Sequence, residues 1–163
     1  MSGEDCEEIQ ADTLEEVVRH CLAELRGKRI DDVIVDDSGL FIDALGGFPG
    51  VYSSYVYKTL GCRGILRLLN GSEDRRARFV CIVGCIAGGA DIVVSGIVEG
   101  SIGYEERGDR GFGFDPIFIP EGYERTFAEM TVEEKNPISH RGRAIRALSS
   151  ALGRRIEEGW NEP

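Results

Sequence analysis

Two β-branched stretches joined by a pair of glycines constrain the fold of this chain most. Residues 79–87 and 91–99 are rich in valine and isoleucine, as half-buried strands are. Gly88 and Gly89 lie between them and can adopt the left-handed backbone that tight hairpin turns require. The sequence therefore predicts a long antiparallel hairpin over residues 79–99.

Helical periodicity on both sides of the hairpin indicates an α/β protein. Thr13 and Glu16 form a capping-box pattern, and the apolar residues that follow recur at helical spacing as far as Leu25. A second helix is expected near residues 62–69. The third is expected to begin after Ser139, a candidate N-cap.

The length of the chain favours one domain. A chain of 163 residues with 42% hydrophobic content can bury one core, and no linker or repeat divides it, so a single domain over residues 1–163 is predicted. We expect the last helix to end near Gly153 and residues 154–163 to form a frayed tail.

Composition limits the classes of partner. A net charge of −10 argues against nucleic acid and anionic membrane surfaces, because both require a basic protein surface. The N-terminus is acidic and lacks the apolar region of a signal peptide, and no stretch approaches a membrane span. Free nucleotides remain possible ligands, since a local cluster of cations is sufficient to bind them.

The cysteines are odd in number, five in all. Cys81 and Cys85 lie in one apolar strand, where four residues span about 13 Å, too far for a disulfide or a shared metal. They are predicted to be buried free thiols in a reducing compartment.

A pair of carboxylates follows an apolar run. Residues 33–36 are expected to form a short buried strand that ends at a turn, with Asp36 and Asp37 at its end. Successive strand residues point to opposite faces, so the two acids cannot both face the same site unless the turn has already begun. One is therefore expected to be the functional carboxylate and the other a supporting neighbour. Ser38 and Gly39 would allow a phosphate to approach closely. A solvated strand-to-turn junction is an equally simple interpretation.

Two further groups of residues have chemistry suited to a nucleotide. Phe112 and Phe114 alternate with glycines before Asp115, which suits the sandwiching of a flat base, although two core phenylalanines in a bend would give the same pattern. His140 and Arg141 follow the Ser139 cap and place donors beside free backbone N–H groups. A structural histidine and an ordinary surface arginine are the alternatives.

Five motifs in this order resemble the inosine and xanthosine triphosphate pyrophosphatase family. They are EIQAD at residues 8–12, DDSGL at 36–40, LGGFPG at 45–50, FGFDP at 112–116 and EKNPISHR at 134–141. The resemblance covers residues 8–152. It implies a mixed, twisted central sheet flanked by helices, in two lobes with a substrate cleft between them. It also implies a homodimer, and composition fits a cytoplasmic enzyme.

The resemblance implies a reaction and assigns residues to it. Water would attack the α-phosphorus of ITP, dITP or XTP with Mg²⁺ present, giving the nucleoside monophosphate and pyrophosphate and cleansing the nucleotide pool. Asp37 matches the metal-binding carboxylate and general base, and Glu8 matches a second metal-binding acid. The residues that match substrate-binding positions are Ser38, Phe112, Gly113, Phe114, Asp115, Lys135, His140 and Arg141, with Asp36 as a supporting residue.

The expected selectivity follows from hydrogen-bond chemistry. Inosine and xanthosine carry a 6-oxo group where adenine has an amine, so donors from His140 and Arg141 would favour them. Guanine shares the oxo group, and nothing in the sequence indicates what would exclude its 2-amino group.

The chain departs from the family at its start. The Thr/Ser-x-x-Asn-x-x-Lys segment that grips the triphosphate in this family is not found before residue 8, so the domain is expected to be shortened at its N-terminus. Fewer cations should weaken triphosphate binding. A non-catalytic nucleotide-binding relative is therefore the alternative. A phosphatase that forms an aspartyl-phosphate is a third possibility, but it usually requires Asp-x-Asp.

Overall fold

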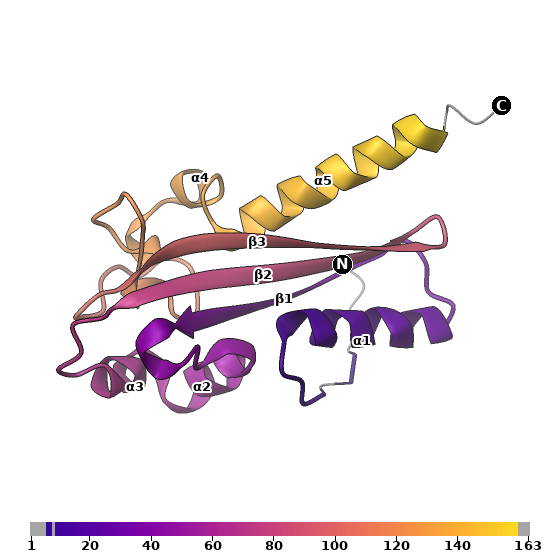
Figure 1. The fold of residues 1–163 in the computed structure, drawn as a ribbon. Coiled ribbons are helices and arrows are strands. Elements are labelled where there is room, and N and C mark those ends of the chain that lie inside the picture. Colours follow the sequence, from indigo (N-terminus) through magenta and orange to yellow (C-terminus); the bar gives the residue numbers. More distant parts are fainter. Residues whose placement is uncertain (1–5, 8, 160–163) are drawn as a thin grey trace.

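The computed structural model describes residues 6, 7 and 9–159, with the backbone alone from residue 156 on, and forms an α/β fold (Figure 1). Its four strands lie in the order β1-β2-β3-β4. The strands are β1 (Val33–Ile42), β2 (Arg76–Ala87), β3 (Ala90–Ile102) and β4 (Phe118–Pro120), and the helices are α1 (Leu14–Gly27), α2 (Ser53–Thr59), α3 (Gly61–Leu68), α4 (Val132–Lys135) and α5 (His140–Gly159). The α/β class is confirmed. Each pair of neighbouring strands in the described sheet is antiparallel, where a mixed sheet was expected.

The predicted hairpin is the centre of the sheet. Strands β2 and β3 pair from Ala87 and Ala90 at the turn to Arg76 and Ser101 at the far end, so both strands are longer than predicted. Gly88 and Gly89 have φ angles of 57° and 76°, the left-handed conformation that the turn requires.

Helices cover both faces of this sheet, α1 on one side and α5 on the other (Figure 1). Two glycines allow them to come close. A Cβ atom on Gly84 would lie 2.6 Å from the Val18 side chain of α1, and one on Gly96 would lie 2.0 Å from the carbonyl oxygen of His140 in α5. The helices therefore pack directly on the backbone of the hairpin.

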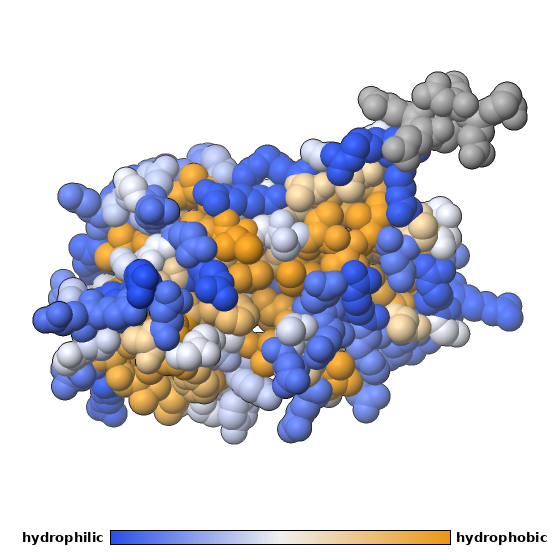
Figure 2. Space-filling model, viewed as in Figure 1, coloured by the Kyte–Doolittle hydropathy of each residue, from blue (hydrophilic) through white to orange (hydrophobic). Residues whose placement is uncertain are grey.

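Three buried clusters hold these layers together. One lies beneath α1, one lies beneath α5, and the largest fills the end of the sheet near α2 and α3. Leu60 and Leu68 remain about half exposed, and Figure 2 shows apolar surface at this end of the molecule. Within the described part of the chain, no helix combines the length and apolarity that a membrane span needs.

The predicted N-caps Thr13 and Ser139 are confirmed, but the predicted capping box is only half formed, because the Glu16 carboxylate accepts from the Asp12 N–H at 3.0 Å rather than from the Thr13 N–H. The Thr13 hydroxyl accepts a hydrogen bond from the Glu16 N–H at 3.2 Å, and the Ser139 hydroxyl accepts one from the Gly142 N–H at 3.0 Å. The predicted end of the last helix is wrong, since α5 continues through Gly153 to Gly159. An interior glycine costs a helix only about 1 kcal/mol relative to alanine, which good helix formers on either side can offset. The rest of the predicted tail, residues 160–163, lies outside the described residues.

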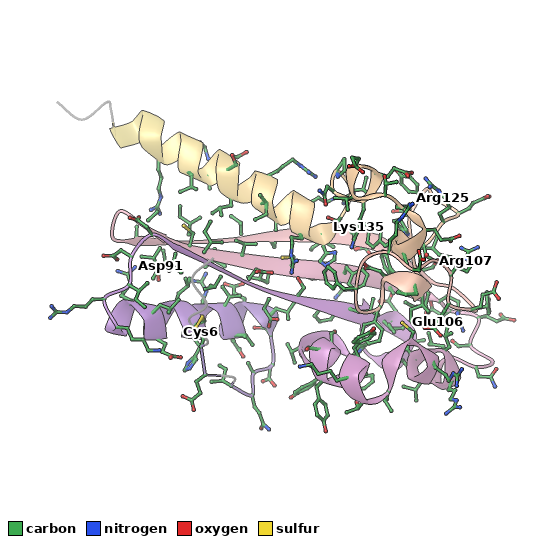
Figure 3. All side chains as sticks on the ribbon, turned by 180° about the vertical axis from the view of Figure 1, so that it is seen from behind. Cys6, Asp91, Glu106, Arg107, Arg125 and Lys135 are labelled. Atoms are coloured by element: carbon green, nitrogen blue, oxygen red, sulfur yellow. A yellow bond between two sulfur atoms is a disulfide. The ribbon has the colours of Figure 1, made fainter. Side chains whose placement is uncertain are left out.

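The cysteines divide into two groups. Cys81 and Cys85 are buried and free, as predicted, and so is Cys62. Cys6 and Cys21 form a disulfide, with their Cα atoms 5.4 Å apart (Cys6 is labelled in Figure 3). It attaches the segment before α1 to that helix, and the linear separation of the two cysteines gave no sign of it.

We predict that this disulfide stabilises the fold measurably. A cross-link between residues 15 positions apart should lower the entropy of the unfolded chain enough to add about 3 kcal/mol to the free energy of unfolding. Urea unfolding with and without a dithiol reductant measures this contribution. The reductant should leave a Cys21→Ser variant unchanged, and an equal response of both proteins would contradict the prediction.

Candidate nucleotide site

Strand β1 separates the two adjacent acids. The strand does not end at Asp36 as predicted but continues to Ile42, because its pairing with β2 is unbroken from Val33 on. Asp36 and Ser38 stand opposite Val83 and Cys81, which belong to the cluster beneath α5. Alternation places Asp37 on the other face, with α1. The turn has not begun, so the two carboxylates point in opposite directions.

On the α5 face, Asp36 makes an ion pair with the first turn of α5. A terminal nitrogen of Arg141 lies 3.0 Å from a carboxylate oxygen of Asp36, and the two residues are 105 positions apart in the sequence. Both side chains are about half exposed. This contact joins the first predicted motif group to the last.

An exposed aromatic ring lies close to two cations beside this pair. The Phe112 side chain is 60% exposed. The Lys135 ammonium lies 4.9 Å from the centre of its ring and the Arg141 guanidinium carbon 5.4 Å from it. Such a ring can stack on a flat base while the cations attract negative charge.

The buried Asp115 carboxylate holds this corner together. One of its oxygens accepts hydrogen bonds from the Lys135 ammonium at 2.6 Å and from the Phe112 N–H at 3.0 Å. Gly111 makes room for it, because a Cβ atom there would lie 2.1 Å from the same oxygen. Asp115 therefore fixes the positions of the Lys135 side chain and the Phe112 backbone relative to each other. The Lys135 ammonium compensates the buried negative charge of Asp115.

The other residues of this segment have different places. Phe114 is buried in the large cluster, with its ring edge-on to Tyr57 at 5.4 Å, so it is not a second exposed face for a base. Gly113 adopts a left-handed φ of 59°, and its carbonyl oxygen accepts a bond from the Cys62 thiol at 3.5 Å. The core interpretation of the phenylalanines therefore holds for Phe114 and fails for Phe112.

His140 is buried and its ring stacks on Phe79, with the ring centres 4.6 Å apart. Burial, and then the positive charges of Lys135 and Arg141, lower the pKa of this imidazole to about 3. The ring is therefore neutral near pH 7. Its Nδ1 atom and the Ser38 hydroxyl oxygen are buried atoms with no hydrogen-bond partner among the described residues. Unsatisfied polar atoms of this kind are expected where a ligand completes the hydrogen bonds.

Sequence reasoning missed two neighbours of these groups, Phe79 and Cys81. Both lie on β2 and face α5. Knowledge of the register of β1 against β2, which places Cys81 opposite Ser38, could have identified them as neighbours of the site. Burial raises the pKa of the Cys81 thiol, and burial followed by the charges of Glu106 and Asp115 raises that of Cys62 to about 12. Neither thiol is a nucleophile near neutral pH.

The predicted metal ligands are only partly described. Glu8 lies outside the described residues. The Asp37 carboxylate is partly buried and accepts a hydrogen bond from the Ser38 N–H at 3.0 Å. Among the side chains described, those of residues 6, 7 and 9–155, no group of three or more acidic, histidine or cysteine residues is placed to hold a metal. A strand-borne carboxylate suits Mg²⁺ nonetheless, because this ion usually binds through one or two carboxylates and substrate phosphates while keeping several waters.

An exposed aromatic ring near two cations, beside an edge strand that presents one acid to each face of the sheet, gives an α/β protein the chemical groups that bind a nucleotide. Comparison with known proteins specifies the family. The model of the Ham1 family matches residues 1–151, and the chain belongs to this family.

Its relatives include curated enzymes and solved structures. The chain is 56% identical to a dITP/XTP pyrophosphatase of Pyrococcus horikoshii, over 86% of this chain and 76% of the relative. It is 58% identical to a dITP/XTP pyrophosphatase of Thermococcus kodakarensis, over 89% of this chain and 78% of the relative. The structure of the Staphylococcus aureus Ham1 protein superimposes with a TM-score of 0.83 at 36% identity, covering 92% of this chain and 81% of that one.

We predict that His140 makes stability depend on pH. Its pKa is lower in the folded protein than the ordinary 6.5, so the unfolded chain binds the proton more tightly. As pH falls from 6.5 towards 3, this residue should remove about 1.4 kcal/mol of unfolding free energy per pH unit. Urea unfolding between pH 7 and 5 should therefore show a loss about 2 kcal/mol larger in the wild type than in His140→Asn. Parallel pH profiles would show that His140 is not a buried neutral group.

Proposed function

We propose that this chain hydrolyses deaminated purine nucleoside triphosphates, namely ITP, dITP and XTP, to the monophosphate and pyrophosphate. The relatives named dITP/XTP pyrophosphatase support this function, and the chain covers more than three quarters of their length. The structural observation that carries it is the corner of Phe112, Lys135, His140 and Arg141, which combines a stacking ring with hydrogen-bond donors. A single domain of this kind would cleanse the nucleotide pool.

Selection of the base follows from the charge states at this corner. Arg141 carries only donors, and the neutral His140 ring carries one N–H. Both can donate to a 6-oxo group, whereas the 6-amino group of adenine would leave those donors unpaired. A buried donor left without a partner, such as the N–H of His140, lowers the affinity for the wrong base by far more than a missing methylene does.

Residues on one face of β1 would bind the base of the nucleotide, and residues on the other face would bind its phosphates. Since β1 is the edge strand of the described sheet, a ligand can pass around that edge from the α5 face to the α1 face. We propose that the base lies on the side of Phe112 and Arg141, and the phosphates on the side of Asp37. The Asp37 carboxylate would accept a proton from the attacking water while the water oxygen forms a bond to the α-phosphorus. The bond from the α-phosphorus to the leaving pyrophosphate would break at the same time.

The resident metal in this proposal is magnesium. Asp37 would hold it, with Glu8 as the second acid that the family resemblance implies. When bound, Mg²⁺ supplies positive charge that offsets the charge of the phosphates. Removal of the metal by a chelator should abolish turnover, and restored turnover on addition of Mg²⁺ would support this assignment.

The first experiment incubates the purified chain with ITP, XTP, GTP or ATP and Mg²⁺, and measures pyrophosphate and orthophosphate separately. We expect pyrophosphate from ITP and XTP at rates well above those from GTP and ATP. Saturable nucleotide binding without any release would instead favour the non-catalytic relative. Orthophosphate as the first product would favour an aspartyl-phosphate mechanism.

We predict that Asp37→Asn lowers the rate of pyrophosphate release by at least about a hundredfold, because the amide can neither accept the proton nor balance the metal charge. Asp43→Asn is the matched control, since Asp43 follows the same strand and its carboxylate makes ion pairs with Arg76 and Arg78. The control should retain wild-type activity. An undiminished rate in Asp37→Asn would remove this residue from the mechanism.

A homodimer and a cytoplasmic location complete the proposal. Both rest on the family resemblance and the composition of the chain. Sedimentation equilibrium would distinguish a dimer from a monomer. Titration of free thiols in protein taken directly from cells would report whether the Cys6–Cys21 disulfide is formed in that compartment.

A further inference from the structure

We propose that Asp36 is a positioning residue that holds Arg141 in the orientation needed to bind the base, so that the adjacent acids Asp36 and Asp37 have separate tasks. This inference rests on the proposed function and deepens it. It assigns Asp36 to recognition of the base, so that of these two acids only Asp37 acts at the phosphates.

The first argument is geometric. Asp36 and Arg141 are joined at 3.0 Å, and the guanidinium carbon of Arg141 lies 5.4 Å from the centre of the Phe112 ring. An exposed arginine side chain samples many rotamers, and ordering it on binding costs conformational entropy. A carboxylate that holds the guanidinium over Phe112 in the free protein removes part of that cost.

The second argument is electrostatic. Arg141 lies in the first turn of α5, where the helix dipole disfavours positive charge, and that turn contains no acidic residue. The acid that would normally stand there is supplied by β1 instead. Lys135, the other cation near the Phe112 ring, has a similar arrangement, because its ammonium donates to the Asp115 carboxylate at 2.6 Å. Each cation beside the ring thus has its own carboxylate.

The effect should appear in binding rather than in stability. Half-exposed ion pairs contribute little to folding stability, so Asp36→Asn should unfold near the wild-type urea midpoint. The loss of orientation should raise the KM for ITP and the Kd for IMP together, about five- to tenfold, and leave kcat within about twofold. The preference for ITP over ATP should fall by a similar factor.

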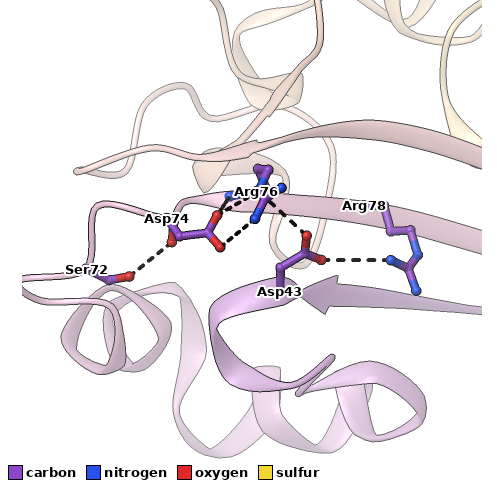
Figure 4. A network of polar contacts seen from close by, with 5 residues as sticks. All are labelled: Asp43, Ser72, Asp74, Arg76 and Arg78. Atoms are coloured by element: carbon purple, nitrogen blue, oxygen red, sulfur yellow. Dashed lines mark hydrogen bonds and ion pairs between the residues drawn. The ribbon is translucent and has the colours of Figure 1, made fainter.

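The network around Asp43 provides a matched control (Figure 4). Asp43 has the same exposed fraction of its side chain as Asp36, 41%, and faces Arg78 at 3.8 Å beyond the other end of β1. Asp43→Asn removes the same charge from a comparable pair without touching the nucleotide corner. This substitution should leave the KM for ITP and the Kd for IMP unchanged.

A double-mutant cycle tests whether Asp36 acts through Arg141. In an Arg141→Gln background, Asp36→Asn should have no further effect on the Kd for IMP, because the group it positions is gone. Asp36→Glu keeps the charge and should restore most of the wild-type affinity. If Asp36→Asn does not fold, Arg141→Lys, which keeps the charge but loses the planar fork, should raise the same two constants.

Calorimetry with IMP keeps this proposal distinct from the proposed function, because IMP has the base but no pyrophosphate to release. A wild type that binds IMP without hydrolysing ITP would refute the function, and the IMP cycle would still test Asp36. The proposal would be overturned by no binding of IMP to the wild type, by unchanged KM and Kd in Asp36→Asn, or by additive effects of the two substitutions. A fall in kcat with unchanged KM would also overturn it, by placing Asp36 at the phosphates.

Discussion

The pairing of β1 with β2 determines where the chemical groups of this protein point. Because that pairing is continuous from Val33 to Ile42, the side chains alternate strictly, and Asp36 and Ser38 face α5 while Asp37 faces α1. The glycines on β2 and β3 that admit the two helices then fix how close each helix comes. The corner of Phe112, Lys135, His140 and Arg141 exists only because α5 lies against this sheet.

The corner also concentrates positive charge in a chain of net charge −10. Lys135 and Arg141 flank one exposed ring, and each is held by a carboxylate from another part of the chain. Burial of His140, and then their positive charges, lower the pKa of its imidazole and keep it neutral. A neutral histidine between two cations can bind an uncharged carbonyl group without adding a third positive charge, which would repel the others.

Features that depend on local sequence were predicted well. The glycine turn of the hairpin and the caps of Thr13 and Ser139 need only a few neighbouring residues, and all are present. Features that depend on distant partners were not predictable. The run from Asp36 to Gly39 has the composition of a turn, but its pairing with β2 keeps it extended. Likewise, nothing local distinguishes the exposed Phe112 from the buried Phe114. The roles of the site residues in binding and catalysis stay predictions.

The alternation along β1 has a consequence for how this protein can evolve. If the strand slipped by one position against β2, Asp37 would meet α5 and Asp36 would meet α1, so the two acids would exchange surroundings while the composition stayed the same. A substitution changes one side chain, but a one-residue deletion between Val33 and Asp36 would reverse every side chain on one side of the gap. This strand should therefore accept new residue types far more readily than a change in its length.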